Sequence, residues 1–325
     1  MPQSPAKRPP YGARRVSPSH PRGRRRADMS TWAAVVPVLT LVPGWLLAMA
    51  LFWLPLRLAL HTRFWVFCLI YLAIGTLLFL RPVQRVALVR LVGARRLTRD
   101  ERAIVDPVWG QLTQSMRSSP RRYVLAVLDA DDLNAFACGG HLVVVTSYAI
   151  NVLPDFELSG VLAHELCHHL GLHTIALTVR HWLGMPVTVL ARIGFFLEHV
   201  AQAATASFAR RSGGLTIVGT AIATVLRIGA WLMLVTVLLS NALSNLVGRT
   251  AEFEADKRAV QLGYGPALSA ALRRFVSTGH ASPPNSWRAR AFASHPSARL
   301  RIARIDAQLR ERQRHPDRAR RPLQA

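Results

Sequence analysis

Acidic residues and lysine are scarce in this chain of 325 residues. There are 17 Asp and Glu against 41 Lys and Arg, and Lys7 and Lys257 are the only lysines. The formal net charge is +24, yet 51% of the residues are hydrophobic and only 18% are charged. A nucleic-acid-binding protein of this charge is expected to be polar overall, and a disordered chain is poor in Leu, Val and Ile. Strong basicity with strong apolarity is typical of membrane segments flanked by cationic loops, so we expect no nucleic-acid partner.

Cysteine is equally rare. Cys68, Cys138 and Cys167 are the only three, and no C-x-x-C pair occurs. Three cysteines cannot form a disulfide framework, which fits a reducing compartment or the absence of any redox role.

Charge is missing altogether from two long stretches, residues 29–56 and 64–80. A bilayer core needs about 20 apolar residues in a helix, so residues 29–80 are predicted to form two transmembrane helices. Two later apolar stretches, 174–196 and 215–247, predict one or two further spans at about 174–247. The first of these contains Arg180, His181 and Arg192, which weakens it as a span. Arg227 interrupts the second, and we expect it to snorkel or to face a polar interior.

The basic residues suggest an orientation for these spans. Eight Lys or Arg precede residue 29, seven lie within residues 81–102, and the loop between the first two spans has two. The positive-inside bias predicts both ends on the cytoplasmic side of a multi-pass cell-membrane protein, with the catalytic site facing the cytoplasm. Residues 1–28 and 311–325 are expected to be basic tails, the first disordered, lying near anionic lipid headgroups.

The segment from residue 98 to 170 has a mixed α+β pattern. Thr98 and Glu101 make a capping-box pattern at the start of a helix over 98–116. Residues 123–128 and 141–146 are strand-like runs rich in Val and Leu, and 155–170 has helical spacing. The predicted fold is mainly α with a small β-sheet, combined with a multi-pass α-helical membrane region.

Residues 164–169, His-Glu-Leu-Cys-His-His, carry the chemistry. His164 and His168 are four residues apart on a helix, so their imidazoles lie on one face and can share a metal ion. Glu165 lies about 100° around the helix and can reach a water on that metal, accept its proton and pass it to a leaving amine. An H-E-x-x-H pattern is expected by chance in on the order of 1% of chains of this composition, so it predicts a metallopeptidase site.

Two histidines leave a zinc site incomplete, because a catalytic zinc takes three protein ligands and keeps one position for water. The third ligand is either a histidine a short distance on, such as His173, or a glutamate from a later helix. Glu252 and Asp256 are four residues apart, on one helical face. That spacing suits a glutamate ligand together with an aspartate that accepts the N–H of a ligating histidine. Cys167 is expected to lie off the metal face as a small buried hydrophobe.

The sequence resembles the HtpX-like membrane metallopeptidases, relatives of the CAAX prenyl endoproteases. The resemblance covers roughly residues 30–310. It is carried by H-E-L-C-H-H, by E-F-E-A-D at 252–256, by residues 134–140, and by Ser294-His295-Pro296 followed by Arg299. The layout agrees too, with two spans before the catalytic segment and apolar helices between the two ligand motifs. The basic tails and the charges in the third apolar stretch depart from the family pattern.

The resemblance implies a zincin-like (gluzincin) peptidase domain over residues 81–310 that binds one Zn²⁺ ion per chain. The implied zinc ligands are His164, His168 and Glu252, with Glu165 as the base and Asp256 supporting a ligand. His295 and Arg299 are implied to stabilise the oxyanion or, alternatively, to make a structural contact. The implied substrate-binding strand and turn comprise Asn134, Ala135, Phe136, Gly139 and Gly140, which would pair with extended substrate backbone.

We expect the partners to be membrane-associated or misfolded proteins and peptides. Four alternatives stay open: a CAAX-type processing protease, a site-2-type intramembrane protease, a metalloprotease-like membrane sensor that does not cleave, and basic tails that bind nucleic acid. The site-2 type uses an Asp from an Asp-Gly dipeptide as its third ligand, and no such dipeptide occurs here.

Overall fold

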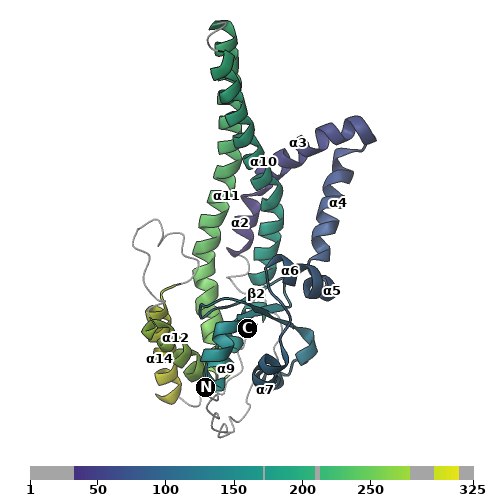
Figure 1. Cartoon of the computed structure of the whole chain (residues 1–325). Coiled ribbons are helices and arrows are strands. Elements are labelled where there is room, and N and C mark those ends of the chain that lie inside the picture. The colour runs from purple at the N-terminus through teal and green to yellow at the C-terminus, as the bar shows by residue number, and fades with distance from the viewer. Residues whose placement is uncertain (1–32, 171–172, 209–212, 279–295, 315–325) are drawn as a thin grey trace, which may run out of the picture.

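Two helical hairpins stand on an α+β body in the computed structural model, which describes residues 33–170, 173–208, 213–278 and 296–314 (Figure 1). The taller hairpin is built by α10 (His173–Phe208) and α11 (Gly213–Gln261). The other comprises α2 (Val35–Leu39), α3 (Val42–Leu60) and α4 (Phe64–Leu77). The expected tails at 1–28 and from His315 onward lie outside the described residues, whereas residues 311–314 continue the last described helix.

Among the described residues, three helices are long and apolar enough to cross a membrane: Val35–Ala59, Thr174–Ser207 and Gly213–Gln261. A fourth is possible if Phe64–Leu77 is counted together with Arg81–Leu91, from which it is bent by 73°. Large apolar side chains cover the outside of the hairpins, for example Leu58, Ile217 and Val225 at 80%, 73% and 68% exposed. Exposed apolar area of this extent is what a lipid-facing surface requires.

The charges inside the tall hairpin have partners on the neighbouring helix. Nε of Arg227 on α11 donates to Oε1 of Glu198 on α10 at 2.6 Å, and Glu198 is buried. Arg180 on α10 donates to Asn241 of α11. Because they are paired, these polar groups require less free energy to lie in an apolar environment than isolated charges would. The sequence indicated a polar interior as one option for Arg227 without identifying Glu198.

A three-stranded sheet occupies the body in the order β1-β3-β2, from β1 (Val124–Leu128), β2 (Ala135–Cys138) and β3 (Leu142–Thr146). β3 pairs parallel with β1 and antiparallel with β2. The central strand is fully buried because Val and Leu fill both of its faces, while β2 forms an edge. The predicted strands lie within one residue of β1 and β3.

Two helices of the body, α7 and α9, start within one residue of where the sequence predicts. α7 (Arg99–Ser115) is capped by Thr98 and Glu101 in the expected capping box, with Thr98 N–H donating to Glu101 at 2.7 Å. A short helix α8 (Ser147–Val152) follows β3. α9 (Asp155–Leu170) has the predicted bounds and packs in one apolar core with α7 and β3. This core holds the metal-motif helix rigidly against the sheet.

Two further helices close the body around α9, namely α12 (Gly265–Ser277) and α14 (Ala298–Arg314). α12 approaches α9 so closely that a Cβ added at Gly160 would lie 2.3 Å from the backbone nitrogen of Leu268. Glycine at this position therefore permits the contact between the two helices. α14 packs on α11 and α12 through Ile305, which is fully buried.

A bent segment links the first hairpin to the body. It consists of α5 (Arg81–Val83), a π-helical turn η1 (Gln84–Leu88) and α6 (Val89–Leu91), and a short 3-10 turn η2 (Pro120–Arg122) precedes β1. Leu88 and Val89 pack against β1 and β3, so the segment lies between the membrane helices and the sheet (Figure 1).

Candidate metal centre

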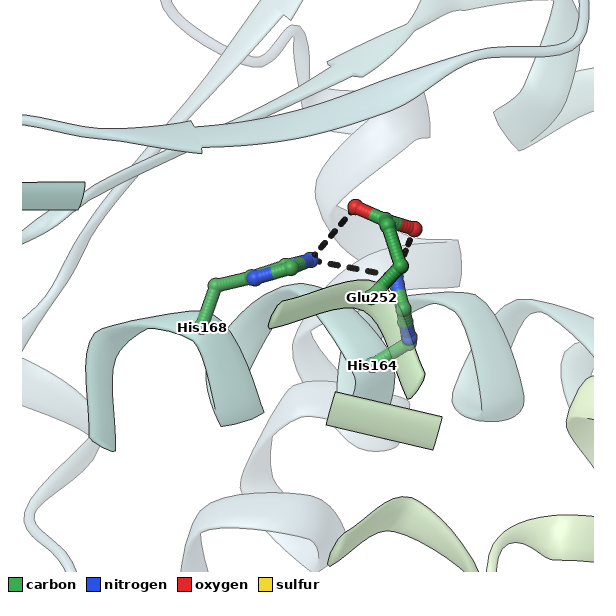
Figure 2. A group of neighbouring side chains, drawn as sticks. All are labelled: His164, His168 and Glu252. Atoms are coloured by element: carbon green, nitrogen blue, oxygen red, sulfur yellow. Dashed lines mark hydrogen bonds and ion pairs between the residues drawn. The ribbon is translucent and has the colours of Figure 1, made fainter. Parts of the chain in front are cut away.

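His164 and His168 project from α9 toward Glu252 of α11, as Figure 2 shows. The two histidines belong to the buried end of α9, and Glu252 lies near the C-terminal end of α11. All three side chains are buried, and their ligand atoms lie within 4.8 Å of one another. α11 is a single helix from the apolar stretch to this site. One arm of the tall hairpin and the third ligand therefore belong to one continuous helix.

The spacing of the three donors fits a zinc ion. The two imidazole Nε2 atoms are 3.2 Å apart, and Glu252 oxygens lie 3.3 Å from His164 Nε2 and 3.1 Å from His168 Nε2. Zinc–nitrogen bonds of about 2.0–2.1 Å in a tetrahedron place ligand atoms about 3.3 Å apart. Two imidazoles and one carboxylate are also a donor set that zinc favours, with a fourth position left for water. The residues present therefore fit the ion that the sequence implies.

Asp256 fixes the orientation of His164. Its Oδ1 lies 2.9 Å from His164 Nδ1, on the far side of the ring from the Nε2 that faces Glu252. A carboxylate on Nδ1 keeps the proton there and leaves Nε2 as the donor to a metal. Burial and the Arg301 charge lower the pKa of His164, but the hydrogen bonds to Asp256 and Glu252 outweigh them and raise it to about 9. The surroundings thus favour positive charge at this point.

Arg301 is the arginine of α14 that reaches the site. Its guanidinium donates to both Asp256 oxygens, lies 3.1 Å from Glu252 and 3.2 Å from His164 Nε2, and is 8% exposed. Arg299, which the sequence comparison favoured, is exposed on the outer side of the same helix. Arg301, not Arg299, therefore lies beside Asp256 and Glu252, because two residues along a helix turn a side chain by about 200°.

A sequence signal for Arg301 existed. Arg301, Ile305 and Leu309 recur at i, i+4 and i+8, and both apolar members pack against the body. This face of the helix is the inner one, and it excludes Arg299. His295 lies outside the described residues, so its role remains a sequence-based expectation.

Glu165 follows His164 on α9 and is 8% exposed. It lies close enough to Arg301 for its charge to raise the pKa of that guanidinium, together with Asp256 and Glu252. The expected base is therefore located in the same buried cluster as the ligands.

The strand proposed for substrate forms the edge of the sheet next to α9. Ala135 and Phe136 lie in β2, and Asn134 precedes it and donates its N–H to Thr146. Gly139 and Gly140 form the following turn with φ of 64° and 86°, where a side chain would be strained. The turn is held from two sides: Gln84 donates to the Gly139 carbonyl, and the Gly139 N–H donates to Thr178 of α10 at 3.2 Å.

Two neighbours of the ligands have structural positions. Cys167 is fully buried among apolar residues of α11 and α12, as expected. His169 is buried as well, with Nε2 3.1 Å from the Leu142 carbonyl, so it joins α9 to β3. A contact with a distant strand leaves no local pattern, so no signal in the sequence indicated this role of His169. The side chain of His173 is outside the described set.

Comparison with known proteins shows the family to which the chain belongs. The model of peptidase family M48 matches residues 100–309, which contain all the described residues of the site. A protease HtpX homolog of Acaryochloris marina is 30% identical over 223 residues, 61% of this chain and 69% of that protein. Another, from Acidiphilium cryptum, is 28% identical over 210 residues, 57% of this chain and 67% of that protein. The crystal structure of S. mikatae Ste24p aligns with a TM-score of 0.49 at 17% identity over 87% of this chain and 68% of that one. The chain belongs to peptidase family M48 and is an HtpX-like membrane metalloprotease.

Proposed function

We propose that the protein is a zinc-dependent endopeptidase in which His164, His168 and Glu252 hold one zinc ion and Glu165 is the general base. The observation that carries this proposal is the close approach of three buried side chains. The two Nε2 atoms are 3.2 Å apart, one Glu252 oxygen lies 3.3 Å from His164 Nε2, and the other lies 3.1 Å from His168 Nε2. Asp256 at 2.9 Å from His164 adds the supporting carboxylate that ligating histidines require.

Each residue of the site has a different role in peptide hydrolysis. Zinc in such a donor set polarises a carbonyl group and acidifies water. Glu165 accepts a proton as water adds to the scissile carbonyl carbon, and it then delivers that proton to the leaving nitrogen. Arg301 holds Asp256 and Glu252 in place by its hydrogen bonds and contributes positive charge beside the reacting oxygen.

The edge strand β2 supports a mode of substrate binding. An extended peptide adding to this edge would form backbone hydrogen bonds with residues 135–138, beside the helix that carries the two histidines. Main-chain pairing accepts many sequences, which suits membrane-associated or misfolded protein substrates. The excess of basic residues near the first two spans supports a site facing the cytoplasm.

The test is the variant Glu165→Gln in purified, reconstituted full-length protein. We expect it to retain zinc, measured by elemental mass spectrometry, and to lose hydrolysis of casein and of quenched fluorescent peptides. Glu254→Gln is the matched control, because Glu254 is half exposed and paired with Lys257 at 3.8 Å. Cleavage by Glu165→Gln at the wild-type rate would refute the mechanism.

Metal removal separates the enzyme from a sensor that does not cleave. A chelator should abolish peptide hydrolysis, and zinc added back should restore it. Wild-type protein that binds no zinc would favour the sensor, and preference for prenylated over unmodified peptides would favour a CAAX-type protease.

A further inference from the structure

A cavity of about 290 Å³ lies at the junction between the first membrane hairpin and the body, away from the metal centre. It is enclosed by the α5–α6 segment, the start of α7 and the outer edge of β1. Three arginines from three different places in the chain line it: Arg85, Arg96 and Arg102. The rest of its wall is formed by Val89, Leu97, Tyr123, Val124, Leu125 and Ala126.

The charge in this cavity is not compensated by its own walls. No Asp or Glu is among the nine described residues that line it, and all three arginines are exposed. Within the described ranges, no ion pair joins any of the three to a carboxylate. The adjacent acids, Glu101 and Asp129, are both engaged by Arg95, at 2.7 Å each. The cavity thus presents three guanidinium groups to whatever enters it.

The edge of β1 adds a backbone donor. Val127 directs its N–H and C=O away from the sheet, to Arg95, at 2.8 and 2.7 Å. Because the direction of backbone groups repeats every two residues along a strand, Leu125 directs its own N–H to the same outer edge, at the cavity wall. Guanidinium groups combined with a backbone N–H form a set of donors suited to phosphate oxygens.

The position of the cavity indicates where the phosphate comes from. The chain bends by 73° after α4, and Arg81–Leu91 then runs across the foot of the hairpin (Figure 1). This segment exposes Val86 at 49% and Leu91 at 74% beside Arg81, Arg85 and Arg90. Apolar and basic side chains exposed together on a helix next to a span are typical of a helix in the membrane interface. The cavity therefore opens at the level of lipid headgroups.

We propose that this cavity binds the phosphate headgroup of an anionic phospholipid, with Arg85, Arg96 and Arg102 as its ligands. Arg85 comes from the interfacial segment, and Arg96 and Arg102 come from the body. A headgroup bound between them would therefore join the body to the bilayer surface. Lipid binding at this cavity requires neither zinc nor peptide hydrolysis, so it can be tested independently of the proposed function.

The test measures lipid binding to the full chain, purified in a neutral detergent, by native mass spectrometry. The probes are dihexanoyl phosphatidylglycerol, dihexanoyl phosphatidylcholine and inorganic phosphate. The test variant is R85Q/R96Q/R102Q. The matched control is R90Q/R99Q/R121Q, which removes the same charge from exposed arginines outside the cavity.

Wild-type protein should bind phosphatidylglycerol more tightly than the other two probes. Each arginine contributes roughly fivefold, so the cavity variant should lose about 100-fold in affinity and the control less than threefold. Circular dichroism establishes that both variants are folded. An equal loss of lipid affinity in both triple variants would mean that the lipid is attracted by overall positive charge rather than by this cavity. Binding of inorganic phosphate as tight as that of phosphatidylglycerol would mean that the cavity is a site for free anions. Either result, or no binding by the wild type, would overturn the proposal.

Discussion

Arg301 and Asp256 form a two-point hydrogen-bonded pair, with Nη2 to Oδ1 at 2.7 Å and Nε to Oδ2 at 2.9 Å. Asp256 Oδ1 is also 2.9 Å from the Nδ1 of His164. The C-terminal helix α14 is thereby connected to a candidate metal ligand through one carboxylate. The site consequently depends on three helices, α9, α11 and α14.

Arg301→Lys should lower kcat/KM for peptide hydrolysis by about 100-fold or more, because lysine cannot make the two-point pair and leaves part of Asp256 unsatisfied. The measurement is steady-state hydrolysis of a quenched fluorescent peptide, with zinc content determined in parallel. Arg299→Lys, two residues away and exposed, is the control and should stay within twofold. Equal losses of activity in the two variants would show that the pairing of Arg301 with Asp256 is not needed for peptide hydrolysis.

Asp256→Asn should weaken zinc binding by about 10–100-fold, since an amide no longer increases the basicity of His164 or fixes its tautomer. Competition with a chelator of known zinc affinity measures this directly. Asp131→Asn, an exposed change in the loop after β1, should leave the affinity unchanged. An unaltered affinity in Asp256→Asn would contradict the supporting role of this carboxylate.

Gly139→Ala should impair peptide hydrolysis without removing zinc. The new Cβ would lie 2.7 Å from Leu88 Cδ2 and 2.8 Å from Gln84 Nε2, at a backbone φ of 64°. We therefore expect the turn after β2 to shift and KM for peptides to rise. Gly110→Ala in α7 is the control, because nothing lies within 4 Å of its added Cβ. It should be neutral or stabilise the protein by up to about 1 kcal/mol. Unchanged KM in Gly139→Ala would separate β2 from substrate binding.

Lowering the pH should reduce the stability that the Arg95–Glu101 ion pair gives to the fold. The hydrogen bond from Arg95 holds the pKa of Glu101 below its ordinary value of 4.5. Because the folded pKa is the lower one, ionised Glu101 stabilises the fold above pH 4.5, and this contribution is lost as pH falls through the folded pKa.

Glu101→Gln tests this, since glutamine still satisfies the capping box with Thr98. Its apparent Tm in detergent should lie below that of the wild type at neutral pH, and the difference should shrink below pH 4.5. Asp131→Asn should show no such convergence. A Tm difference that is constant with pH would exclude the ion pair as its source.

The sequence by itself determined the local elements and the motif helix. The capping box at Thr98 and the bounds of α9 follow from spacing within one or two helical turns, which short-range chemistry fixes. The spacing of His164 and His168 likewise predicted a shared helical face, and the apolar stretches predicted the long apolar helices of the two hairpins. Each of these depends on residues that are close in the chain.

Tertiary structure alone decided which distant groups meet. Arg301 rather than Arg299 faces Asp256, because the side of α14 that packs on Ile305 sets its rotation. Glu198 neutralises Arg227 across the hairpin, and His169 reaches the Leu142 carbonyl. The cavity lined by Arg85, Arg96 and Arg102 likewise exists only where separate segments converge. Such contacts depend on how whole helices and strands pack against one another. Periodicity can mark the buried face of a helix, as it does for Arg301, but it does not identify the partner that this face meets.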